Sequence, residues 1–120
     1  MTVNKNVYSF EEAHTMKDLT LTIGHNVNGV PTHTYTHVVA FTAAALQLEG
    51  LTAWECTGFW EGEVEHSTRI EIDAIEEDRL ERILSQIPSL AEALKQNAIT
   101  VQIRDSATAF VEPIRISATA

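Results

Sequence analysis

The clearest pattern in the chain lies between Glu63 and Ile72, where charged and hydroxyl residues alternate with valine, histidine, threonine and isoleucine. Side chains of a β-strand point alternately to the two faces of its sheet, so this segment has one packing face and one polar, mostly acidic face. The preceding segment, from Leu51 to Trp60, is also rich in strand-forming residues, and Gly62 lies in an acidic turn between the two. We therefore expect a β-hairpin whose second strand is packed on one side only.

A strand and a helix are predicted before this hairpin. Apolar residues alternate with threonine over Leu19–Ile23, a pattern typical of a strand. The segment 24–31 contains two glycines, two asparagines and a proline, so it is expected to be a loop. A threonine-rich lead follows, in which Thr34 or Thr36 can act as the N-cap of a helix that runs to about Leu48.

A second helix and a last strand are predicted after the hairpin. Asp73 resembles a helix N-cap, and an apolar stripe follows over residues 80–94. Pro88 is expected to break this helix, because the residue before a proline resists the α conformation. Residues 99–103 alternate as the last core strand, and an extended segment over 109–116 is a possible extra C-terminal strand.

The resulting element order is β-α-β-β-α-β, which is typical of the ferredoxin-like α+β sandwich. Right-handed crossovers place the first and third strands in the centre of a four-stranded antiparallel sheet, with both helices on one face. At 120 residues the chain is long enough for one core. We expect a single domain over 1–120, with residues 1–17 as an N-terminal extension and 18–117 as the ferredoxin-like core.

Charge and composition exclude several classes of partner. The formal net charge is −9, from 17 acidic and 8 basic residues, and the basic residues are scattered along the sequence. Nucleic-acid backbones and anionic membranes attract the opposite charge, so we expect direct binding to neither. The single cysteine, Cys56, fits a reducing compartment, and the first residues lack the apolar run of a signal peptide. The expected location is the cytoplasm.

The five histidines are the first candidates for chemistry. His33 and His37 are four residues apart and, with His25, could offer three imidazoles to a metal ion. No cysteine or carboxylate lies nearby in sequence to complete the shell, so we expect neither a metal site nor a cofactor. His66 lies on the packing face of a central strand, where a buried structural histidine is favoured over a general base. It is nevertheless the candidate catalytic residue of the chain.

The face of the sheet that the helices leave open is the second candidate surface. Its polar side chains come from the predicted hairpin and from the last strand. It lacks the aromatic and basic side chains with which RNA-binding modules of similar topology stack bases. The candidate ligand or interface residues on this open face are Glu65, Ser67, Arg69, Glu71, Gln102 and Arg104.

Short motifs around the hairpin resemble a bacterial family of small domains of unknown function. The matching residues are Gly50-Leu51-Thr52, Gly58-Phe59-Trp60, the segment 65–68 and the segment 96–99, which together extend over about half of the chain. Thr68 stands where that family has a lysine, so a role of the lysine in ligand binding would be absent here. The resemblance implies a similar fold and carries no established activity.

These observations favour a non-enzymatic interaction or ligand-binding module that forms homo-oligomers. Its open face would bind a second copy, a protein partner or a small polar ligand. One alternative is an acidic inhibitor of phage type that occupies the basic site of a nucleic-acid-binding protein. Another is a small cofactor-free enzyme that uses His66, which a closed apolar cavity reaching this residue would favour.

Overall fold

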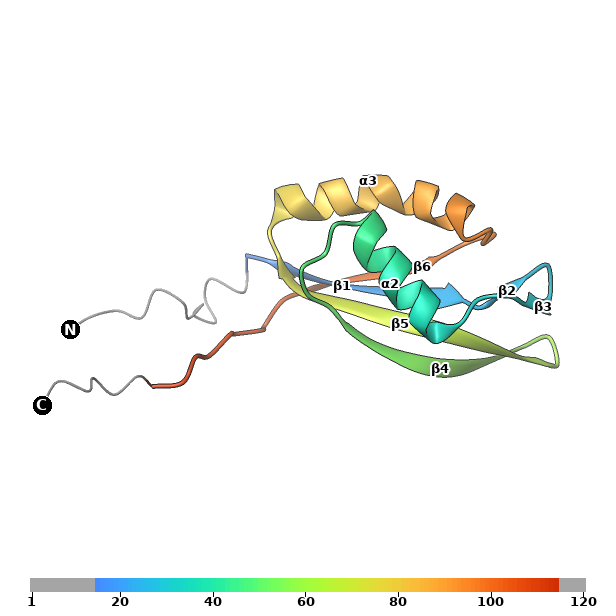
Figure 1. The fold of residues 1–120 in the computed structure, drawn as a ribbon. Coiled ribbons are helices and arrows are strands. Elements are labelled where there is room, and N and C mark those ends of the chain that lie inside the picture. Colours follow the sequence, from blue (N-terminus) through green and yellow to red (C-terminus); the bar gives the residue numbers. More distant parts are fainter. Residues whose placement is uncertain (1–14, 115–120) are drawn as a thin grey trace, which may run out of the picture.

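The computed structural model describes residues 15–114 and contains two helices on one face of a four-stranded antiparallel sheet (Figure 1). A short two-stranded ribbon follows the first strand. In chain order the elements are β1 (Lys17–Gly24), β2 (Asn26–Val27), β3 (Val30–Pro31), α2 (Tyr35–Ala45), β4 (Thr52–Trp60), β5 (Glu63–Ile75), α3 (Glu77–Ala93) and β6 (Thr100–Asp105).

The strand order β4-β5-β1-β6 confirms the ferredoxin-like arrangement, with the first and third strands of the pattern in the centre. In the register of the sheet, Leu21 of β1 lies between Ile70 of β5 and Val101 of β6. Neighbouring residues in this register point to the same face, so these apolar side chains all lie on the helix side. The face of the sheet opposite the helices is therefore the open face.

The core lies between the central strands and the two helices. Leu19, Leu21 and Ile23 of β1 and Ile70 of β5 are fully buried. Helix α3 covers them with one apolar stripe, whereas α2 contributes fewer buried residues. The buried apolar residues of the two helices and of the turn after each are Val38, Leu46, Leu80, Ile83, Ile87, Leu90 and Leu94.

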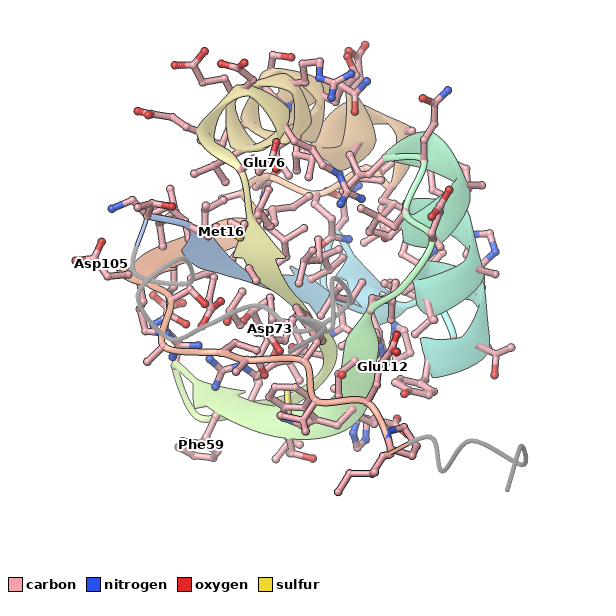
Figure 2. All side chains as sticks on the ribbon, turned by 90° about the vertical axis from the view of Figure 1, so that its left-hand side faces the viewer. Met16, Phe59, Asp73, Glu76, Asp105 and Glu112 are labelled. Carbon is pink, nitrogen blue, oxygen red and sulfur yellow. The ribbon has the colours of Figure 1, made fainter. Side chains whose placement is uncertain are left out.

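The two helices differ from the prediction at their ends. Thr34 caps α2, since its hydroxyl accepts the backbone N–H of His37 at 3.1 Å, as expected for one of the two predicted caps. Helix α2 ends at Ala45, earlier than predicted, and Gln47 takes the left-handed conformation that closes it. Helix α3 begins after Glu76 rather than after Asp73. Asp73 lies in β5, below the N-terminal end of the helix in Figure 2.

Pro88 does not break α3, contrary to the prediction, and the helix runs unbroken from Glu77 to Ala93. Proline removes one backbone hydrogen bond and crowds the preceding turn. Pro88 lies on the exposed side of the helix, where water can bind the carbonyl that loses its donor. Ile87 and Leu90, on either side of Pro88, are both buried, so packing against the sheet holds the two halves of the helix in line.

A β-bulge extends β5 beyond its predicted end. Lys17 pairs with Ile75 and Leu19 with Ile72, so the two residues between them in β5 face Asp18 alone. The side chain of Asp18 accepts the backbone N–H of Ala74 at 2.9 Å, and Ala74 has a φ of 52°. This hydrogen bond holds the bulge and turns the chain towards α3.

Beyond β6 the chain forms no further strand over residues 106–114, so the predicted extra C-terminal strand is wrong for the described part of its range. Ser106 is fully buried, and its backbone N–H donates to the carbonyl of Met16 at 3.0 Å. Residues 115 and 116 of the predicted strand and most of the predicted N-terminal extension lie outside the described residues. Neither helix of the described part is long and apolar enough to cross a membrane.

The helix packing generates a test of the core. Leu90 is 2% exposed, whereas Leu84, on the edge of the same stripe, is only partly buried. We expect Leu90→Ala to lower the free energy of unfolding by about 2–5 kcal/mol, because it removes buried surface and leaves a cavity. Leu84→Ala should cost clearly less. Urea denaturation of both variants measures the two losses in the free energy of unfolding. Equal losses, or a larger loss in Leu84→Ala, would contradict this packing.

Candidate functional site

Several turns converge at one end of the sheet, opposite the end where β1 begins and β6 ends (Figure 1). The β2–β3 ribbon, the turn between β4 and β5, and the C-terminal end of α3 all lie there. Two pockets open at this end, and Asn26 lines both of them. We call them the acidic pocket and the histidine pocket.

The acidic pocket has a volume of about 670 Å³, within the range of small-molecule sites. Two carboxylates and one ammonium group lie in its wall, together with several amide side chains. A zwitterionic or cationic ligand with hydrogen-bonding groups matches this combination of charges. The lining residues are Asn26, Asn28 and Gly29 of the ribbon, Glu63, Val64 and Glu65 of β5, and Lys95, Gln96, Asn97, Ala98 and Thr100 around the loop before β6.

Gln96 connects three elements at this pocket. Its side-chain Nε2 donates to the carbonyl of Asn26 at 3.0 Å and to the carbonyl of Leu94 at 3.2 Å. These two bonds fasten the ribbon to the end of α3. The side-chain oxygens of Gln96 and Glu65 both lie beside Gly24, the last residue of β1, where a β-carbon would collide with Oε1 of Glu65.

The histidine pocket, of about 460 Å³, lies on the helix side of the sheet beside the first residues of α2. It is open rather than closed, and its wall is polar and aromatic. It therefore lacks the closed apolar cavity that would favour a cofactor-free enzyme using His66. Its lining residues are His25, Asn26, Pro31, His33, Thr34, Tyr35, Thr36, Glu55 and His66.

His66 is exposed, so the prediction of a buried structural histidine at this position is wrong. It has the phase of the packing face, but burial on β5 begins only at Thr68, because the helices do not extend over the end of the strand. The Nδ1 of His66 lies 3.4 Å from the hydroxyl of Thr57. His66 is thus a wall residue of an open pocket.

The buried histidine is His25, at 5% exposure. Its Nε2 lies 2.7 Å from the hydroxyl of Thr68, and its backbone N–H donates to the carbonyl of His66 at 2.9 Å. Its own carbonyl accepts the N–H groups of Thr32 and His33. The burial of His25 could have been predicted from the sequence, because His25 continues the apolar alternation of β1 by two residues beyond Ile23.

The remaining histidines of the described chain also have structural contacts. The Nε2 of His33 lies 2.8 Å from the carbonyl of Leu94, and its ring stacks on that of His37 with centroids 5.6 Å apart. Among residues 15–114 no group of three or more histidine, cysteine or acidic side chains is placed to hold a metal ion.

The open face brings the other predicted site residues together. The Nη2 of Arg69 donates to Oε1 of Gln102 at 2.8 Å, and its guanidinium lies 5.7 Å from the ring centre of Trp54. Arg104 forms an ion pair with Glu71 at 3.5 Å. Ser67 lies on the same face, whereas Glu65 lies further along β5, in the acidic pocket. Sequence reasoning missed Trp54, although its register with Arg69 follows from the predicted hairpin.

Asp73 lies beside this network, at the bulged end of β5. Burial, followed by hydrogen bonding to and repulsion from Glu71 and then repulsion from Asp18, raises the pKa of Asp73 to about 6, while Arg104 opposes the shift. The Oδ1 of Asp73 is buried and has no hydrogen-bond partner. The charge of this carboxyl therefore changes near neutral pH.

No protein-family model and no curated protein matches the sequence. The fold resembles two solved structures of a phage SAM lyase. One, in complex with S-methyl-5′-thioadenosine, is 20% identical, with a TM-score of 0.66 over 79% of this chain and 84% of that chain. The apo form is 24% identical, with the same TM-score over 80% and 85%. A nitrogen regulatory PII-like protein from Thiomonas intermedia K12 is 15% identical, with a TM-score of 0.49 over 82% and 96%.

The burial of His25 generates a pH-dependent stability. Burial lowers the pKa of His25 below 6.5, with His66 and His33 adding to the shift and Glu55 and Glu65 opposing it. The unfolded chain therefore binds a proton more readily, and the stabilisation by neutral His25 is present above pH 6.5 and lost as the pH falls through the folded-state pKa. The raised pKa of Asp73 acts in the opposite direction, so the test must compare variants.

We expect His25→Gln to be less stable than the wild type at pH 8, with a difference that narrows towards pH 5. Thermal denaturation across this pH range measures it. Asp73 is present in both proteins, so its contribution cancels in the comparison. A difference that stays constant with pH would show that the proton on His25 is not involved.

Proposed function

We propose that this chain binds S-adenosylmethionine in the acidic pocket and cleaves it, releasing methylthioadenosine. The observation that carries the proposal is the likeness of fold to a phage SAM lyase over about four-fifths of both chains. The proposal agrees with the small-ligand binding expected from the sequence, and it departs from the expectation that the module is non-enzymatic.

The charges of the acidic pocket support this substrate. S-adenosylmethionine carries a sulfonium and an ammonium group, and Glu63 and Glu65 offer carboxylates to cationic groups. Lys95 offers a cation to the carboxylate of the amino-acid arm. The asparagine and glutamine amides of the wall supply the hydrogen-bond donors and acceptors that an adenine ring requires. The net charge of −9 also favours the approach of a cationic ligand.

Release of methylthioadenosine breaks the bond between the sulfonium sulfur and the amino-acid arm, and the bonding electron pair moves to sulfur. The arm leaves as an alkene after loss of a proton, or as a lactone if its own carboxylate displaces the sulfur. The two products are isomers, which chromatography separates. The pocket contributes by holding the arm in one geometry while the bond breaks.

Incubation of the purified protein with S-adenosylmethionine tests the proposal, with methylthioadenosine measured by liquid chromatography. We expect release by the wild type, and a KM raised about 10-fold or more in Glu65→Gln, because a charge-assisted hydrogen bond contributes about 1.5–3 kcal/mol. Glu61→Gln, an equal change of charge in the turn outside the pocket, is the control. Absence of both binding and release in the wild type would refute the proposal.

We further propose that the open face is a self-association surface between copies of this chain. Trp54 is 39% exposed there, and the Nε of Arg69 is buried without a hydrogen-bond partner. On this face of β5, Arg69 is the one basic side chain and lies between Glu65 and Glu71, so a two-fold arrangement can place Arg69 against the acidic residues of a second copy. This matches the homo-oligomer expected from the sequence.

Arg69→Glu is expected to weaken self-association while changing the stability of the isolated fold by only about 1–2 kcal/mol, because within the chain Arg69 contributes a partly exposed hydrogen bond to Gln102 and a ring contact with Trp54. At an interface the same guanidinium is desolvated, and its removal costs more. Sedimentation velocity of the wild type and the variant measures association. Arg82→Glu, the same charge reversal on the exposed side of α3, is the control. A wild type that stays monomeric at high concentration would contradict the proposal.

A further inference from the structure

At Gly24 an added side chain would meet the side-chain ends of two other residues, while the backbone conformation places no demand for glycine. Gly29 and Gly62 have positive φ values and nothing within 4 Å of an added β-carbon. Gly24 lacks a positive φ, so its backbone is open to any residue. A β-carbon there would collide with Oε1 of Glu65 and lie 3.1 Å from Oε1 of Gln96. The absent side chain thus leaves a niche that two side-chain oxygens share.

The orientation of the Gln96 amide is fixed by its hydrogen bonds. Its Nε2 donates to the carbonyls of Asn26 and Leu94. The oxygen of the amide consequently faces the niche as an acceptor. The Glu65 carboxylate beside it is also an acceptor, so two acceptor oxygens, one of them charged when Glu65 is ionised, border the same space.

We propose that Gly24 is a specificity-determining position, because its niche holds the Glu65 carboxylate beside the Gln96 amide oxygen so that both accept hydrogen bonds from a primary ammonium group of the ligand. An ammonium group has three N–H donors and can satisfy both oxygens at once. A sulfonium group has no N–H donor. The proposal rests on the proposed function and assigns this niche to the α-ammonium of the amino-acid arm.

The niche can be filled without removing any charge. In Gly24→Ala the new methyl group takes the place of the carboxylate, which is the mobile end of a flexible side chain and therefore moves aside. Glu65→Asp also removes the carboxylate from the niche, because it keeps the charge and shortens the side chain. Gly50→Ala is the matched control, because nothing lies within 4 Å of its added β-carbon.

Isothermal titration calorimetry with two stable ligands measures how much the amino-acid arm contributes to the binding affinity. S-adenosylhomocysteine has the amino-acid arm and a neutral sulfur, whereas methylthioadenosine lacks the arm. We expect the wild type and Gly50→Ala to prefer S-adenosylhomocysteine, and Gly24→Ala and Glu65→Asp to lose about 10-fold of that preference. Their affinity for methylthioadenosine should be unchanged. A preference that survives in Gly24→Ala overturns the inference and leaves the proposed function standing.

A ligand-free measurement tests the niche independently. The NMR signals of the Gln96 side-chain amide should shift in Gly24→Ala and in Glu65→Asp, and stay in place in Gly50→Ala. Unchanged signals would overturn the placement of Glu65 beside Gln96. If the wild type binds none of the adenosyl compounds, the proposed function fails and the assignment to the ammonium group falls with it.

Discussion

The burial of one face of β1 and β5 beneath the two helices is the constraint on which the rest of the structure depends. Leu19, Leu21 and Ile23 of β1 and Ile70 of β5 have no exposed surface. Burial of each such side chain contributes about 1.5–3 kcal/mol. Because side chains alternate along a strand, this packing also determines that Arg69 and its neighbours point to the opposite face. The open face is thus a geometric consequence of the core.

The helices cover less of the sheet than its strands span, and the pockets lie where this cover ends. On β5, burial begins at Thr68 and continues towards α3, whereas residues 63–66 line the two pockets. The ribbon and the loop before β6 close this end from two sides. Asn26 lies in both pocket walls, and its carbonyl is held by Gln96. The candidate site is therefore built from turns that a rigid core positions.

The sequence was sufficient for the features that repeat along an element. Alternation predicted the strands and the open face, the element order with right-handed crossovers predicted the strand order, and the apolar stripe predicted the buried side of α3. The sequence was insufficient for features that depend on tertiary packing. The continuity of α3 through Pro88 depends on burial on both sides of the proline, and the exposure of His66 depends on where the helices stop. The niche over Gly24 joins residues from β1, β5 and the turn after α3, which no local pattern brings together.

The β2–β3 ribbon pairs only two residues on each side, and a two-stranded ribbon of this kind is marginal in isolation. Its order depends on contacts that His25, His33 and Gln96 make to the body of the domain. Local opening of the ribbon therefore requires less free energy than global unfolding, and its amide hydrogens exchange with solvent sooner than those of β1. A ligand that contacts the ribbon slows this exchange, and the loss of conformational freedom in the ribbon is part of the entropic cost of binding.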